Sequence, residues 1–188
     1  HPLYIASVDA YSGKSVTALA VGLHLKEAGH RVGYFRPLGS LPHTVGDTVT
    51  DEDALFISNA LNPEAPVEAI CPLLFTPELV ARALQGDLAA LPGQIKEAYA
   101  KASAGREVMI VGGLGDLARG SLLGLSAPAI AELLDAKVLV LAVSAVVAAG
   151  AGLYVGGGAA SVCLWFVLVF PPAAGGRLLA NFPLRHHE

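Results

Sequence analysis

The sequence has few charged residues for its length. Asp, Glu, Lys and Arg make up 15% of the 188 residues, and none of them occurs from 138 to 176. Typical soluble domains contain about 25%. The twelve Lys and Arg residues form no basic stripe, and the formal net charge is −4. Because a nucleic-acid backbone is bound by clustered positive charge, the composition argues against a nucleic-acid partner.

Cysteine is also scarce, and no export signal is visible. Cys71 and Cys163 are far apart and outside any CxxC spacing, so neither a disulfide framework nor a zinc site is indicated. The first apolar run, Leu3–Val8, is too short for a signal peptide and lacks a basic flank. We therefore expect a reduced, cytoplasmic setting and one domain that covers residues 1–188.

The amino-terminal segment has the pattern of a strand, a loop and a helix. An apolar run at Leu3–Ala6 leads into Ser-Val-Asp-Ala-Tyr-Ser-Gly-Lys-Ser at 7–15, and apolar residues then recur at helical spacing as far as Gly29. Small loop residues let backbone N–H groups converge on phosphate oxygens, and the helix adds its positive end. Lys14 supplies a charge for the outer phosphates, and Ser15 supplies a hydroxyl for Mg²⁺.

The segment at 7–15 therefore predicts a phosphate-binding loop, with a nucleotide as its partner and ATP with Mg²⁺ as the expected ligand. A Ser-Gly-Lys-Ser turn that only caps a helix is the alternative. Val8 stands where the standard pattern has glycine.

The rest of the chain alternates apolar strands with helices. The strands are continuous apolar runs, as expected for a parallel sheet that is buried on both faces. A polar connection is expected at 36–50, Thr76 and Ser126 are expected to cap helices, and Pro92-Gly93 precedes another helix. The further strands are expected at 31–35, 107–111 and 137–143, and the further helices at 51–61, 77–84 and 94–102. The sequence thus predicts a doubly wound α/β fold of the P-loop type, with a mostly parallel sheet and helices on both faces.

Four motifs resemble those of the dethiobiotin synthetase-like P-loop proteins. They are the loop at 7–15, Phe35-Arg36-Pro37, Asp51-Glu52-Asp53-Ala54 and Val111-Gly112-Gly113-Leu114-Gly115. The chain looks most like the amino-terminal domain of phosphotransacetylase-family proteins. In these relatives the loop is one residue longer than the standard form, so Ser7 matches its first small residue in place of Val8. The resemblance covers roughly 3–142, and residues 142–188 are atypical.

The resemblance implies where ATP and Mg²⁺ would bind. Mg²⁺ would be held by Ser15 and Asp53, and Asn181 would lie near the adenine base. Lys14 and Arg36 would stabilise charge on a transferred phosphoryl group, with Arg36 standing where relatives usually have Lys. The residues implied for the phosphates are Ser7, Asp9, Ser12, Gly13, Lys14, Ser15 and Val16.

One residue departs from the pattern that the resemblance implies. A third metal ligand is expected directly after the strand at 107–111, where relatives have an acid and this chain has Gly112. A glycine has no side-chain oxygen to hold a metal or its water. Asp116 is a candidate substitute if its loop folds back, and a solvent-facing turn residue is its other interpretation.

The missing acid shapes the expected function. We expect an ATP-binding domain with a regulatory or ligand-sensing role. Two alternatives stay open: a Mg-ATP-dependent ligase of the dethiobiotin synthetase type, and a protein-interaction domain that has lost the nucleotide. A small carboxylate ligand and a second copy of the chain are further candidate partners, and the chain is a candidate fragment of a longer multidomain protein.

The uncharged segment at 138–176 has three interpretations. Buried strands at 138–143 and 163–170 would fit the family topology. A membrane segment would meet the length criterion, but Gly156-Gly157-Gly158 weakens a helix and Pro171-Pro172 follows closely. Because charge and family pattern are lost together, a reading-frame difference from the natural gene is the third interpretation.

Overall fold

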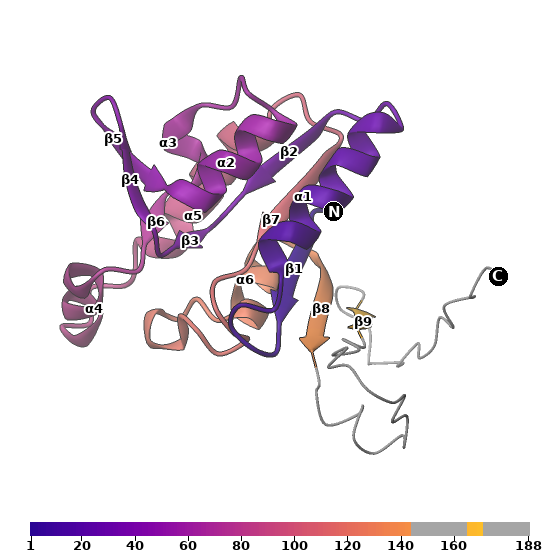
Figure 1. Cartoon of the computed structure of the whole chain (residues 1–188). Helices are drawn as coiled ribbons and strands as arrows, with labels where there is room; N and C mark the ends of the chain where they lie inside the picture. The colour runs from indigo at the N-terminus through magenta and orange to yellow at the C-terminus, as the bar shows by residue number, and fades with distance from the viewer. Residues whose placement is uncertain (144–164, 171–188) are drawn as a thin grey trace, which may run out of the picture.

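A five-stranded sheet forms the centre of the computed structural model, which describes residues 1–143 and 165–170 (Figure 1). Its strand order is β2-β7-β1-β8-β9. Neighbouring strands from β2 to β8 run parallel, and β9 pairs antiparallel with β8. The strands are β1 (Leu3–Ser7), β2 (Val32–Phe35), β7 (Val108–Gly112), β8 (Lys137–Val143) and β9 (Trp165–Phe170).

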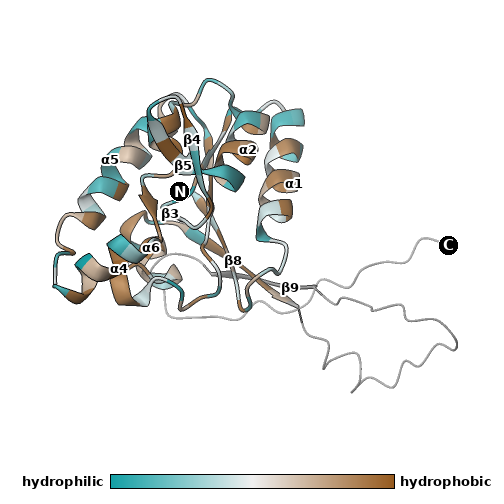
Figure 2. Ribbon diagram, turned by 60° about the vertical axis from the view of Figure 1, so that its left-hand side comes forward, coloured by the Kyte–Doolittle hydropathy of each residue, from teal (hydrophilic) through white to brown (hydrophobic). Residues whose placement is uncertain are grey.

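Helices cover both faces of this sheet, as Figure 2 shows. Each face has its own buried core, because successive side chains of a strand point to opposite faces. Ile5 and Ile110 belong to one core, whereas Tyr4 and Val111 belong to the other. The predicted doubly wound, mostly parallel α/β fold is confirmed. The covering helices are α1 (Lys14–Glu27) and α2 (Glu52–Leu61) on the first face, and α5 (Leu91–Ser103) and α6 (Ala127–Leu133) on the second.

The expectation of a plain polar connection at 36–50 is wrong. That segment contains β3 and a hairpin in which Val45 pairs with Thr48 across a two-residue turn (Figure 1). Gly46 in the turn has φ 59, a left-handed conformation that suits glycine. Gly-Asp between two short β-prone runs is the signal that could have revealed it. The short elements are β3 (Leu38–Gly39), β4 (Pro42–Val45), β5 (Thr48–Asp51), α3 (Val67–Ile70), β6 (Leu73–Leu74) and the 3-10 helix η1 (Ser121–Leu123).

Most predicted helix ends agree with the structure. Thr76 caps α4 (Pro77–Leu84) by accepting a hydrogen bond from the Leu79 N–H at 3.3 Å. Gly29 follows α1 in the left-handed conformation, with φ 92. Ser126 occupies the N-cap position of α6, but its hydroxyl makes no capping bond. α5 begins at Leu91, before Pro92-Gly93, because proline is tolerated in the first turn of a helix, whose N–H groups need no helical partner.

The strand order determines where a ligand site can form. β1 lies between β7 and β8, and the chain leaves β1 and β7 through helices on opposite faces. Such a reversal opens a crevice at the carboxyl ends of the strands. The loop after β1 starts at this edge, as do the segments that follow β2 and β7. The motifs at 7–15, 35–37 and 111–115, which are distant in sequence, therefore meet at one edge of the sheet.

After residue 143 the structure describes only the backbone of strand β9. β9 lies within the strand predicted at 163–170, and the rest of the uncharged segment after residue 143 lies outside the described residues. Within 1–143 and 165–170, no helix has the length and apolar character required to cross a membrane.

Candidate phosphate-binding site

The loop joins the end of β1 to the start of α1. Gly13, with φ 79, occupies the N-cap position of α1, and no side chain caps the helix. The first helical bond is donated by Thr17 N–H to the Gly13 carbonyl, at 2.9 Å. The backbone N–H groups of the first turn therefore point out of the helix, where they and the helix dipole favour an anion.

The side chain of Lys14, the first residue of α1, reaches back over the loop. Its Nζ donates to Ser7 Oγ at 2.6 Å and to the Gly115 carbonyl at 2.5 Å, so it links β1 to the segment after β7. Its residue exposure is 9%. Burial, and then the charge of Arg36, lower the pKa of Lys14, while Asp116 partly opposes this shift. The ammonium group, carried by the first residue of α1, thus lies between the end of β1 and the segment after β7.

Ser15 and Asp53 bring the first turns of α1 and α2 together. Ser15 Oγ donates to Asp53 Oδ2 at 2.5 Å. The two helices approach closely further along because Gly22 has no side chain: a Cβ there would lie 2.5 Å from Leu61 Cδ1. The pair offers one hydroxyl and one carboxylate oxygen to a ligand at the loop.

Arg36 follows β2 and holds two carboxylates. Its Nη1 donates to Asp51 Oδ1 at 2.6 Å, and its Nη2 is 2.9 Å from Asp53 Oδ2. The side chains of Arg36 and Asp51 are 7% and 0% exposed, whereas that of Asp53 is 28% exposed. Burial alone would lower the pKa of Arg36, but Tyr34, Asp51 and Asp53 outweigh it and raise that pKa above its ordinary value.

Asp51 is a site residue that sequence reasoning places only in the first turn of a helix. Its Oδ1 accepts from Ala54 N–H at 2.9 Å, and this bond caps α2. Its Oδ2 accepts from the N–H groups of Ser40 and Leu41, at 2.8 and 2.9 Å. Gly39 makes room for this carboxylate, because a Cβ there would lie 2.6 Å from Asp51 Oδ2. Asp is a common N-cap residue, and this signal could have revealed the bond to Ala54, but the contact with Arg36 is visible only in three dimensions.

Gly112 ends β7 directly beside Tyr34. A Cβ at Gly112 would overlap the Tyr34 hydroxyl oxygen. This hydroxyl is fully buried, and within the described part of the chain it has no hydrogen-bond partner. Burial raises the pKa of Tyr34 to about 12. A tyrosine from β2 therefore fills the space in which a longer side chain at 112 would lie.

Comparison with known proteins identifies the family. A family model described as an AAA domain matches residues 1–149. This chain belongs to that family. It is similar to ATP-dependent dethiobiotin synthetase BioD of Caldicellulosiruptor saccharolyticus, with 28% identity over 120 residues, which are 62% of this chain and 49% of the relative. The protein of the same name from Caldicellulosiruptor bescii is 28% identical over 119 residues, covering 61% and 48%.

The predicted membership of the dethiobiotin synthetase-like P-loop proteins is thus confirmed, and the chain is a nucleotide-binding P-loop domain. The chain spans about half the length of the curated relatives it matches. The closer link to phosphotransacetylase-family proteins stays a prediction, as does a single domain over residues 1–188.

The structure brings some predicted site residues of this P-loop domain together and leaves others apart. Asp116 Oδ1 accepts from the N–H groups of Ala118 and Arg119, at 2.8 and 2.9 Å, which is the geometry of a turn residue. Val16 is 73% exposed in the first turn of α1. Asn181 lies outside the described residues. Ser7, Ser12, Gly13, Lys14 and Ser15 all belong to the loop or to the start of α1, and Asp9 accepts from Ser12 Oγ through its carbonyl at 2.7 Å.

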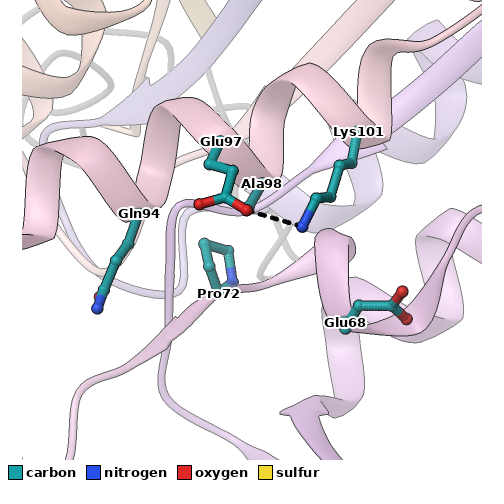
Figure 3. Close-up of a pocket in the computed structure, with 6 residues that line it drawn as sticks. All are labelled: Glu68, Pro72, Gln94, Glu97, Ala98 and Lys101. Carbon is teal, nitrogen blue, oxygen red and sulfur yellow. Dashed lines mark hydrogen bonds and ion pairs between the residues drawn. The ribbon is translucent and has the colours of Figure 1, made fainter.

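A hollow on the α5 side is separate from the P-loop. It has a volume of about 270 Å³ and is lined by side chains of α3, α5 and the segment after α3 (Figure 3). Glu97 and Lys101 lie one turn apart on α5 and pair at 2.9 Å along one side of it, and both are largely exposed. Exposed ion pairs of this kind contribute little to binding or stability. The hollow therefore adds no group to the phosphate site.

A side chain at Gly112 should destabilise the protein. Gly112→Ala forces its methyl group into the Tyr34 hydroxyl, and overpacking of this kind costs about 1–3 kcal/mol in urea unfolding. Gly93→Ala is the matched control, since a Cβ there meets nothing within 4 Å. Because Tyr34→Phe removes the hydroxyl, Gly112→Ala should cost less stability in the Tyr34→Phe protein than in wild type. An equal cost in the two proteins would contradict the contact.

Acid should destabilise the protein through Asp51. Burial alone would raise its pKa, but Arg36 and the surrounding backbone N–H groups lower it below its ordinary value. A carboxyl with a lowered folded pKa stabilises the fold above its unfolded pKa of about 3.9, and this contribution disappears as pH falls through the folded pKa. In urea unfolding, the stability difference between wild type and Asp51→Asn should therefore narrow below about pH 4. A constant difference would show that the carboxylate charge does not contribute.

Proposed function

We propose that this domain binds ATP with Mg²⁺ on its loop and acts as a regulatory or ligand-sensing module. The observation that carries the proposal is the uncapped amino end of α1, whose first residue, Lys14, carries an ammonium group. Outward N–H groups and a cation on one loop suit a polyphosphate. The names of the relatives, both ATP-dependent enzymes, favour ATP among nucleotides.

The oxygen atoms of Ser15 and Asp53 suit Mg²⁺. Magnesium is usually bound by one or two carboxylates together with phosphate oxygens and water, so a hydroxyl and a carboxylate 2.5 Å apart fit a site that ATP completes. The ion would neutralise charge on the β and γ phosphate oxygens.

Weak turnover is the second part of the proposal. The resemblance implies an acid at the end of β7, and Tyr34 occupies the space beside Gly112 where such a side chain would lie. Asp116 holds its turn through Oδ1, which leaves Oδ2 alone to act in place of that acid. Both Nη atoms of Arg36 are bonded to carboxylates, so a phosphoryl group would have to compete for them. We therefore propose binding without efficient hydrolysis.

Lys14→Ala should weaken ATP binding strongly. The variant removes the cation next to the outward N–H groups, and we expect the Kd from calorimetry with ATP and Mg²⁺ to rise at least about tenfold, as for a lost charged hydrogen bond. Lys96→Ala, on the exposed side of α5, is the matched control and should bind as wild type does. Wild-type protein that binds no ATP at millimolar concentration would sink the proposal and favour a protein-interaction domain.

An ATP-dependent ligase is the second candidate, because the named relatives are dethiobiotin synthetases. In a ligase, Lys14 and Arg36 would stabilise the transferred phosphoryl group. Phosphate release that requires an added diamine and bicarbonate would establish this activity. We expect no substrate-stimulated release across a panel of carboxylates and diamines, with Lys14→Ala as the blank.

The wider context is proposed from the resemblance of the sequence motifs alone. The domain would stand at the amino-terminal end of a longer cytoplasmic protein of the phosphotransacetylase type. A small carboxylate ligand and a second copy of the chain are the proposed partners besides the nucleotide.

A further inference from the structure

The carboxylates on Arg36 differ in how tightly they are held. Asp51 is completely buried and lies 2.6 Å from Nη1, while Asp53 is 28% exposed and lies 2.9 Å from Nη2. Three backbone N–H groups also fix the Asp51 carboxylate, from Ser40, Leu41 and Ala54. Charge attraction is stronger in a buried environment than at a solvated group. Asp51 is therefore the main counter-ion of the guanidinium, and Asp53 is the secondary one.

This division leaves negative charge at the loop. One guanidinium is shared by two carboxylates, so the cluster of Arg36, Asp51 and Asp53 has a net charge of −1. The surplus lies on the more exposed member, Asp53, whose Oδ2 also receives the Ser15 hydroxyl at 2.5 Å. Without the charge of Asp51, the guanidinium would have only Asp53 as a charged partner and would neutralise it.

We propose that Asp51 is a positioning residue that holds Arg36 away from full pairing with Asp53 and so keeps Asp53 able to bind a divalent cation beside Ser15. The inference rests on the proposed binding of ATP with Mg²⁺. Asp51 itself is completely buried, so it would touch neither the nucleotide nor the metal. Its effect reaches the metal through the guanidinium alone.

The test compares ATP binding with and without metal. Calorimetry on the full chain gives the Kd for ATP in EDTA and in excess Mg²⁺. The readout is the Kd in EDTA divided by the Kd in Mg²⁺, which measures how much the metal strengthens binding. Asp51→Asn should reduce this ratio at least about fivefold, a coupling typical of residues in one charge network. Its Kd in EDTA should change little. A merely structural role would weaken binding equally in both buffers and would overturn the inference.

A double variant keeps the test decisive if Asp51→Asn does not fold. Arg36→Met with Asp51→Asn removes both buried charges, an exchange that proteins often tolerate. Asp53 then has no guanidinium, so the ratio should equal or exceed that of wild type; a lower ratio would overturn the inference. Glu107→Gln is the matched control, because Glu107 also pairs with an arginine, Arg31, but outside the site, just before β7. Its ratio should match wild type.

The outcomes also separate this inference from the proposed function. Wild-type protein that binds no ATP in either buffer would remove the proposed function itself. Wild-type protein that binds ATP with the same Kd in both buffers would leave ATP binding intact and refute the role of Asp53 and Asp51.

Discussion

The buried guanidinium of Arg36 holds the functional edge of the molecule together. It stands after β2 and reaches Asp51, at the end of the β4–β5 hairpin, and Asp53, in the first turn of α2. Burying an arginine is costly unless its charge is paired and hydrogen-bonded. The guanidinium therefore requires the carboxylates of Asp51 and Asp53 beside it. Through Asp53 and Ser15 the same network reaches the first turn of α1. The positions of hairpin, helix and loop thus depend on one another.

Packing and chemistry meet at the end of β7. Tyr34 fills the space next to Gly112 with an aromatic ring, which contributes buried apolar area to the core under α1 and α2. The hydroxyl on that ring remains without a partner in the described part of the chain, and an unpaired buried hydroxyl is unfavourable. A glycine at 112 is required by this arrangement. An acid at 112 is therefore excluded by the packing of β7 against Tyr34 of β2.

In the phosphate loop, local sequence determines the backbone conformation and tertiary contacts determine the direction of the lysine side chain. The succession of strand, small residues and helix is sufficient to place outward N–H groups at Gly13–Val16. The direction of the Lys14 side chain is a separate matter. It is set by Ser7 and by the Gly115 carbonyl, which arrives from a segment about one hundred residues away. Local sequence therefore places the N–H groups of the loop, and long-range contacts orient the Lys14 side chain.

The sequence by itself determined the order of strands and helices, the loop and the family, because these depend on short-range periodicity and on residues such as Gly13 and Gly29 whose backbone needs are local. Only the tertiary structure decided the pairing of Asp51 with Arg36 and the contact of Tyr34 with Gly112. The first contact joins residues 15 positions apart, and the second joins residues 78 positions apart. Charge pairing and steric exclusion act through space, and the folded sheet alone brings these side chains within reach.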